Sequence, residues 1–283
     1  LELGTYASIK LIKENNYAGV YGIKSGLINI NTVQTEIPDE GVLLSAELNK
    51  VNLELFNSLF NNLNSKPLIT NANINIQELD IYGYKILNSN IKYLPSNTNA
   101  SIQILSDDVV GNILWDETDN LFKAGFEKLH LKTTNALIDN ESKFVFSNPP
   151  KINIKVKSLM LDEDAYGDLS LAAIKEDKVW NIQNFKITNP THTINGTGLW
   201  MDEGLNPNTS INFTWNVYNI QKTLDRLSYP DLIKDGEASV IGMLSWPNSP
   251  FDFDKSSLKG NFSLTATDGV VLEAKPGVAR LFG

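Results

Sequence analysis

The chain has 283 residues, with 24 Lys or Arg against 33 Asp or Glu, which gives a formal net charge of −9. That balance argues against a nucleic-acid partner, because binding a phosphate backbone requires a basic surface. The chain has no cysteine, which excludes disulfides, zinc–thiolate sites, iron–sulfur clusters and cysteine nucleophiles. No run of it reaches the ~20 apolar residues of a membrane helix.

Alternation of apolar and polar residues dominates the chain and predicts strands, because successive side chains leave opposite faces of a sheet. In chain order, clear alternating runs lie at residues 28–31, 73–76, 152–157, 211–218 and 262–267. Turn signals punctuate the chain, among them Asp39-Glu40-Gly41, Asn189-Pro190 and Asp268-Gly269. The spacing predicts a mainly β fold built from antiparallel meanders.

Helical spacing is confined to a few places. Apolar residues from Val51 to Leu63 fall on one stripe, which predicts a covering helix with an asparagine at its start as N-cap. A short helix is predicted over residues 220–227, with Asn219 as its N-cap. A third helix is expected to begin at Pro276, because proline is favoured in the first helical position.

The pattern G-x-x-x-W occurs three times, over residues 111–115, 196–200 and 242–246. Each copy lies in an expected strand, and the echo suggests a repeated unit of several strands. The five tryptophans are candidates for a sugar-stacking surface, but their aliphatic partners in the alternation favour packing on the sheet.

Candidate catalytic and metal-binding groups are few. Acidic clusters at residues 107–108, 116–119 and 162–164 lie between expected strands and lack the spacing of a calcium loop, so we expect solvated turns. His130 and His192 are expected to be exposed, since no Ser or Asp motif surrounds either. Nucleotide-binding glycine motifs and G-x-S-x-G do not occur. The sequence therefore predicts a protein that is not an enzyme and needs no cofactor.

The apolar face of the sheet is the remaining candidate for function. Alternation fits a closed sandwich, and it equally fits a curved open sheet whose apolar face forms a trough. A trough would suit acyl chains, because burial contributes about 0.8 kcal/mol for each methylene. Assigned by alternation, the expected lining residues are Ile152, Ile154, Val156, Phe185, Ile187, Ile211, Phe213, Trp215, Val217, Phe262 and Leu264.

The C-terminal part of the chain resembles a known family. The segment L-S-W-P-N-S-P at residues 244–250 and the ending D-G-x-x-L-x-x-x-P-G-x-x-R-L-x-G over residues 268–283 are the most specific parts of an ordered series that covers roughly residues 150–283. The series resembles the C-terminal region of the AsmA-like proteins, in the YhdP branch. Residues 37–41 and the helical stripe after them fit the same family more loosely.

The resemblance implies a long antiparallel, strongly curved sheet that forms an open apolar groove with a few short helices. Residues 1–283 would be one continuous β-groove segment of a longer chain. Its approximate sub-units would be residues 1–70 (strands and the covering helix), 71–150 (a strand repeat) and 151–283 (the AsmA-like C-terminal region, truncated at its end).

The implied function is transport of phospholipid between the inner and outer membranes of Gram-negative bacteria, which supports outer-membrane integrity. The full protein would lie in the periplasm, tethered to the inner membrane, with phospholipid acyl chains and the two membranes as partners and with no catalytic residues. Two alternatives stay open on the sequence. One is a structural or adhesive β-rich module that binds protein or glycan, and the other is a hydrolase.

Overall fold

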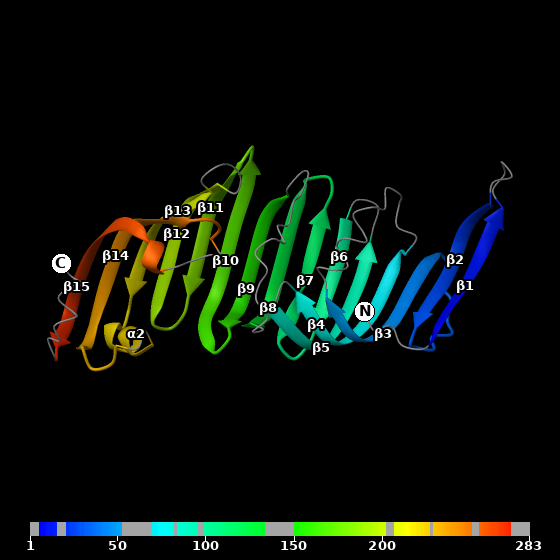
Figure 1. Cartoon of the computed structure of the whole chain (residues 1–283), viewed down its shortest axis with the longest axis horizontal. Coiled ribbons are helices and arrows are strands. Elements are labelled where there is room, and N and C mark those ends of the chain that lie inside the picture. Colours follow the sequence, from blue (N-terminus) through cyan, green and yellow to red (C-terminus); the bar gives the residue numbers. More distant parts are fainter. Residues whose placement is uncertain are drawn as a thin grey trace. The chain divides into compact units, whose positions relative to one another are not determined.

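The computed structural model describes residues 6–15, 21–52, 69–81, 84–95, 99–133, 150–201, 207–226, 229–250 and 255–272. Most of these residues form β-strands, which follow one another in the sheet in the order of the sequence (Figure 1). The mainly β prediction is confirmed.

The strands of the first half are β1 (Ala7–Asn15), β2 (Tyr21–Ile30), β3 (Gly41–Asn52), β4 (Asn71–Ile81), β5 (Tyr84–Pro95), β6 (Asn99–Leu105), β7 (Val109–Asp116) and β8 (Leu121–Thr133). Those of the second half are β9 (Lys151–Leu161), β10 (Asp164–Glu176), β11 (Val179–Thr188), β12 (His192–Met201), β13 (Asn208–Val217), β14 (Ile233–Pro247) and β15 (Lys259–Val271). In the described ranges the helical elements are α2 (Ile220–Arg226) and the 3-10 turn η1 (Lys255–Ser257).

The chain divides into two compact units, and the division falls within β9. Unit 1 contains Leu1–Pro149 and Val156–Ala165, and unit 2 contains Pro150–Lys155 and Tyr166–Gly283. The expected sub-units 1–70, 71–150 and 151–283 stay predictions. The continuity of one groove over residues 1–283 stays a prediction.

Strand directions in unit 1 depart from the antiparallel prediction. β3 is parallel to both β2 and β4, with Leu27 opposite Leu43 and Leu48 opposite Ile76. Residues 31–40 cross from the end of β2 to the start of β3, because a parallel neighbour cannot be reached by a hairpin turn. Asn29 is buried beneath this crossing and donates from Nδ2 to the Gln34 carbonyl at 3.0 Å.

The contacts of β8 with β9 also advance in the same direction along both strands, as in a parallel pair. The Glu127 carboxylate lies 2.8 Å from Lys157 Nζ, and the Leu131 carbonyl accepts from the Asp162 N–H at 2.7 Å. The alternation of apolar and polar residues did not predict these parallel pairings, since it has the same form in parallel and antiparallel strands. In unit 2, by contrast, β10 to β15 are antiparallel throughout.

The helix predictions had mixed outcomes. The helix expected from Val51 is wrong at its start, because Val51 and Asn52 complete β3 and the Val51 side chain is buried. Residues 53–63 and the helix expected at Pro276 lie outside the described residues. The middle helix is confirmed as α2, and the Asn219 side chain caps it by accepting from the Lys222 N–H at 2.8 Å.

One turn prediction is also corrected. Asp268-Gly269 lies inside β15, where Asp268 has a left-handed φ of 57°. Asp235 on β14 has the same conformation (φ 57°) and lies opposite Gly269. The two strands therefore bend together at this level. The Asp268-Gly269 pair marks a kink within the β14–β15 pair, and not the end of a strand.

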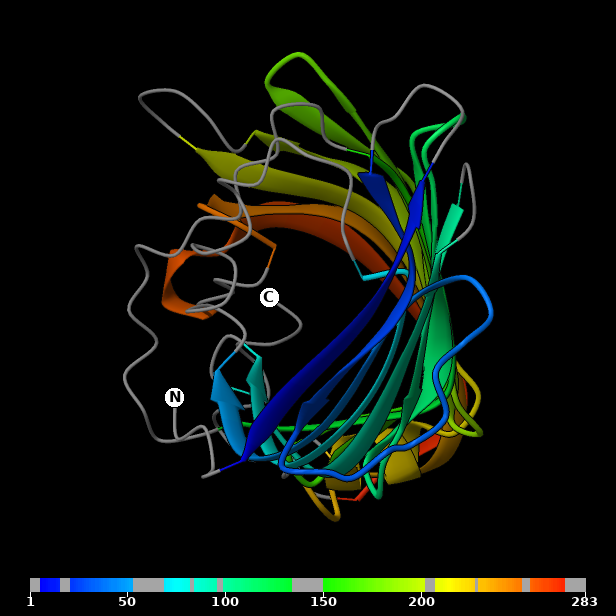
Figure 2. The same cartoon turned by 90° about the vertical axis from the view of Figure 1, so that its right-hand side faces the viewer.

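Glycines show which face of the sheet in unit 2 is concave. A Cβ at Gly196 or Gly260 would lie 2.1 Å from a carbonyl oxygen of a neighbouring strand, and one at Gly242 would lie 2.4 Å from such an oxygen. All three glycines point to the same face, so the strands crowd together on that side. Glycine permits such bending because it has no side chain. Figure 2 shows the bowed strands of unit 2 in yellow to red.

Candidate functional site

The strand register of unit 2 arranges the concave face in rows that run across the strands. The tryptophan row is Trp180, Trp200, Thr209 and Trp246; the isoleucine row is Ile182, Gly198, Ile211, Leu244 and Gly260; the phenylalanine row is Phe185, Gly196, Phe213, Gly242 and Phe262. The Trp215 row is Ile187, Ile194, Trp215, Val240 and Leu264, and the valine row is His192, Val217, Ala238 and Ala266. The concave face of unit 2 is therefore its apolar face.

The tryptophan row forms a packed wall at one end of the strands. The rings of Trp180 and Trp200 stack with centroids 6.0 Å apart and an interplanar angle of 12°. Trp180 and Trp246 are buried, and Trp246 Nε1 donates to the Ser249 carbonyl at 3.0 Å. The packing interpretation of these tryptophans is confirmed.

The valine row forms the opposite wall, beside α2. Val217 is 5% exposed, and Ile220 at the start of α2 is also buried. Gly236 on β14 lies under α2, since a Cβ there would be 3.1 Å from Cδ1 of Ile220. Between the two walls, the side chains of the phenylalanine and Trp215 rows are half-buried, except for Phe262, which is 57% exposed.

The predicted lining residues of unit 2 share this apolar face. Phe185, Ile187, Ile211, Phe213, Trp215, Val217, Phe262 and Leu264 all belong to its rows. Ile152 packs against the buried cluster of Ala173, Trp180 and Ile182, and the alternation of β9 directs Ile154 to the same side. Val156 belongs to unit 1 and is 2% exposed, so it has little free surface. The lining role of all these residues stays a prediction.

Sequence reasoning missed part of the face. Ile194, Val240 and Leu244 stand in the same rows, and their alternation with polar neighbours was the available signal. From unit 1 it named only Val156, although Ile74, Ile91, Ile104 and Phe126 share a face there. The two glycines of the phenylalanine row, Gly196 and Gly242, each begin a copy of the G-x-x-x-W pattern.

In unit 1 the alternation changes phase along the strands. On β4, Ile74 and Ile76 are followed by Leu79 and Ile81, so the apolar residues change parity after Gln77. Asn88, on the neighbouring strand, has a left-handed φ of 51° at the same level. Both sets of apolar residues therefore join one cluster, whose buried members are Val51, Ile76, Leu79, Ile86 and Val109.

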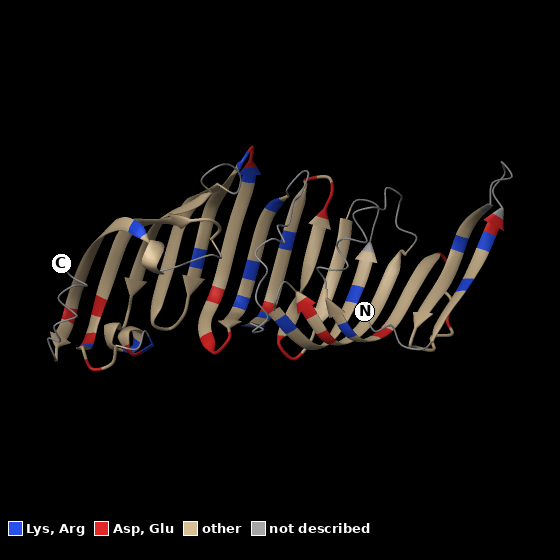
Figure 3. Cartoon of the chain, in the orientation of Figure 1, with Lys and Arg blue, Asp and Glu red and all other residues tan. Residues whose placement is uncertain are grey.

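The opposite face of unit 2 is polar, and on its middle strands β12 and β13 it carries no charge. Asn195, Thr197, Asn212 and Thr214 occupy it on β12 and β13, two strands without any Asp, Glu, Lys or Arg. The charges of β14 lie near its start (Figure 3). Four apolar side chains are exposed on this face, namely Leu199, Met201, Ile241 and Met243.

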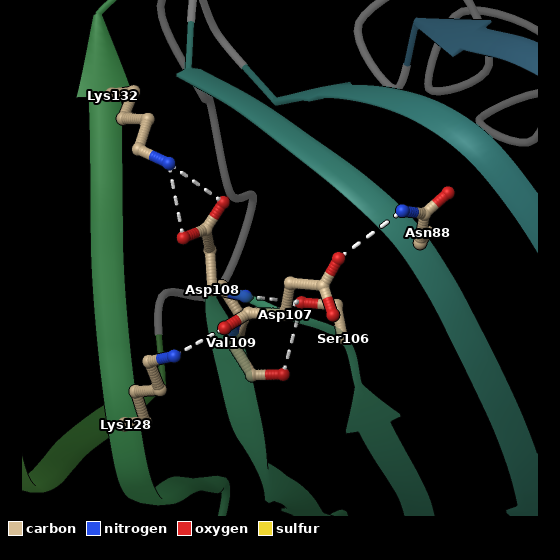
Figure 4. Close-up of polar contacts among 7 residues, drawn as sticks. All are labelled: Asn88, Ser106, Asp107, Asp108, Val109, Lys128 and Lys132. Atoms are coloured by element: carbon tan, nitrogen blue, oxygen red, sulfur yellow. Dashed lines mark hydrogen bonds and ion pairs between the residues drawn. The ribbon is translucent and has the colours of Figure 1, made fainter.

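Polar contacts gather at the hairpin between β6 and β7 (Figure 4). Ser106 Oγ accepts from the Val109 N–H at 2.8 Å, and Asn88 Nδ2 donates to the Asp107 carboxylate at 3.1 Å. Lys132 Nζ lies 3.1 Å from both carboxylate oxygens of Asp108. Lys128 Nζ donates to the Asp107 carbonyl. The Ser106 contact closes the turn itself, and the contacts of Asn88, Lys128 and Lys132 tie the turn to β5 and β8, so the cluster fixes the hairpin. Asp107 is exposed as expected, whereas Asp108 is half-buried.

Both histidines are half-buried, which corrects the expectation that they are exposed. His130 Nε2 lies 3.1 Å from Ser158 Oγ, and burial, followed by the charge of Lys128, lowers the His130 pKa. The His192 ring meets Trp215 edge-on at 5.8 Å, and burial, followed by the charge of Arg226, lowers the His192 pKa. In the described ranges, no group of three or more His, Cys, Asp or Glu side chains is placed to hold a metal ion.

Concave apolar rows, walled at both strand ends and backed by a polar face, define unit 2 as a β-groove segment. The chain belongs to the YhdP family, because the family model described as YhdP protein matches residues 1–283. The resemblance to the AsmA-like proteins is thereby confirmed. At the level of the family this is a lipid-transport type of protein, associated with membrane-linked function in the periplasm.

No curated protein and no solved structure matched the chain. Within the parts of the chain that the structure describes, no helix has both the length and the apolar character to cross a membrane.

Proposed function

We propose that this chain is a segment of a periplasmic bridge-like protein that carries phospholipid between the inner and outer membranes and supports outer-membrane integrity. One observation carries the proposal. The central rows of the apolar face of unit 2 keep free surface on the concave side of the sheet, while packed walls cover both ends of the strands. Family membership supports it independently.

In this proposal the acyl chains lie against the apolar rows and the headgroups face water. Each methylene that leaves water contributes about 0.8 kcal/mol, so the face holds acyl chains without a specific polar contact. Movement along the face needs no cofactor and no catalytic step. The tether to the inner membrane and the contacts with both membranes would belong to parts of the full-length protein outside this chain.

The proposal is tested with a matched pair of exposed residues on opposite faces of neighbouring strands. Phe262 on β15 is 57% exposed on the apolar face, and Ile241 on β14 is 59% exposed on the polar face. We expect native mass spectrometry to find phospholipid on the purified chain and on its Ile241→Asp variant, but not on Phe262→Asp. Both variants should keep the circular dichroism spectrum of the parent. Lipid that survives Phe262→Asp, or a chain that carries none, would contradict the proposal.

A second candidate, a β-rich module that binds protein, is favoured by the four exposed apolar side chains on the polar face of unit 2. For the Ile241→Asp and Phe262→Asp variants, this second candidate predicts the opposite result from the lipid proposal. Ile241→Asp would then remove a binding partner, and Phe262→Asp would leave binding unchanged.

A further inference from the structure

We propose that acyl chains cross unit 2 along one level of the strands, the phenylalanine row, with Phe185, Phe213 and Phe262 as the contacts that position them. The inference rests on the proposed function and specifies where on the apolar face the lipid lies. Four features of the row carry it.

The first feature is its composition. Phe185, Phe213 and Phe262 alternate with Gly196 and Gly242 across five consecutive strands. A Cβ at Gly196 would lie 2.8 Å from Cε1 of Phe185, so the Phe185 ring covers the glycine. The row therefore presents aromatic carbon where glycine lacks a side chain, and no side chain in it carries a polar atom.

The second feature is its position between the walls. Thr209 of the tryptophan row and Val217 of the valine row lie on β13 with Phe213 midway between them. Rows two residues apart are separated by about 6.6 Å along a strand. The phenylalanine row is thus the level furthest from both packed ends.

The third feature is its direction. A row follows the order of the strands, so a chain that moves along it passes from β11 to β15 without a change of level. Phe262, on the last described strand, is the most exposed residue of the row. The row is therefore open to solvent at that strand.

The fourth feature is the contrast with the other rows. In the Trp215 row, the indole Nε1 is buried without a hydrogen-bond partner. That row therefore contains a polar side-chain atom, which the phenylalanine row lacks. The isoleucine row supplies Ile182 itself to a buried cluster, whereas the phenylalanine row only packs Phe185 against that cluster, as the isoleucine row also does with Ile211. The phenylalanine row combines the absence of polar side-chain atoms with Phe262, the one large apolar side chain of the five rows that is exposed.

The test is photocrosslinking at single positions. p-Benzoyl-phenylalanine is placed at Phe185, Phe213 or Phe262, at Ile211 or Trp215 on the same strand and face as Phe213, and at Ile241 on the opposite face. Each purified variant of the chain is irradiated with vesicles of phosphatidylethanolamine and phosphatidylglycerol that carry radiolabelled acyl chains. Benzophenone reacts with C–H bonds in van der Waals contact, so labelling at the phenylalanine positions should exceed labelling at Ile211 and Trp215 by at least about threefold.

The outcomes distinguish the path along the phenylalanine row from the proposed function. Equal or stronger labelling at Ile211 or Trp215 than at Phe213 would overturn the path while leaving lipid transport in place. Labelling no higher on the apolar face than at Ile241 would overturn the proposed function itself.

A second measurement covers positions where the bulky residue prevents folding. The chain has no cysteine, so Phe213→Cys, Ile211→Cys and Trp215→Cys each introduce one thiol. The same vesicles should slow maleimide labelling of Phe213→Cys several-fold more than labelling of the other two variants, and equal protection would reject the path.

Discussion

Unit 1 and unit 2 use the same alternation of apolar and polar residues with different results. In unit 1 the alternation changes phase after Gln77, and apolar residues of both parities enter one large buried cluster. In unit 2, β12 and β13 keep a strict register, and the buried cluster is confined to Ala173, Trp180 and Ile182. The parity also changes on β11 of unit 2, between Ile182 and Phe185, and both residues take part in that small cluster. The strands with regular alternation, β12 and β13, are the ones whose central apolar side chains stay half-exposed.

The largest expected effect on stability concerns the buried cluster of unit 1. Leu79 is 2% exposed there, so Leu79→Ala should lower the free energy of unfolding by about 3 kcal/mol through lost burial and a residual cavity. Phe262→Ala on the open face of unit 2 should cost less than about 1 kcal/mol, because Phe262 is already largely exposed. Urea unfolding followed by circular dichroism measures both. Equal losses would show that unit 2 is packed as tightly as unit 1.

A smaller effect is expected from the glycines that bend unit 2. In Gly196→Ala the new Cβ meets the Asn212 carbonyl oxygen, so the strands must move apart at a cost of about 2 kcal/mol. Gly22→Ala in unit 1 is the control, because a Cβ there meets nothing within 4 Å. The melting temperature should fall for Gly196→Ala and stay nearly constant for Gly22→Ala. If both variants have the melting temperature of the parent chain, the strands are not crowded on the concave face.

The smallest effect is the pH dependence of the two histidines. Burial lowers the folded-state pKa of His130 in unit 1 and of His192 in unit 2. The unfolded chain then binds more protons just below its own histidine pKa of ~6.5, so stability falls as the pH drops through that value. His192→Gln should flatten the pH dependence of the unfolding free energy between about pH 7 and 5, and His130→Gln should flatten the remainder. A slope that is unchanged in the double variant would assign the dependence to other groups.

Much of the apolar face could be predicted from local pattern. Ile211, Phe213, Trp215 and Val217 share one side of β13 because strand geometry alternates side chains, whatever the neighbours are. The N-cap of α2 was likewise local, since Asn219 satisfies an N–H only three residues away. The half-buried state of the histidines was not predictable, because it depends on the residues that pack around them, including Trp215 for His192 and Ser158 for His130.

By itself the sequence determined the class of secondary structure, the strands and the residues that share a face, because each depends on side chains a few positions apart. Tertiary structure decided the parallel placement of β3, the packing of both sets of apolar residues of β4 into one cluster and the alignment of Phe185, Phe213 and Phe262 in one row. Each of these depends on the register between strands, which backbone hydrogen bonds set and which leaves no mark in the alternation of a single strand.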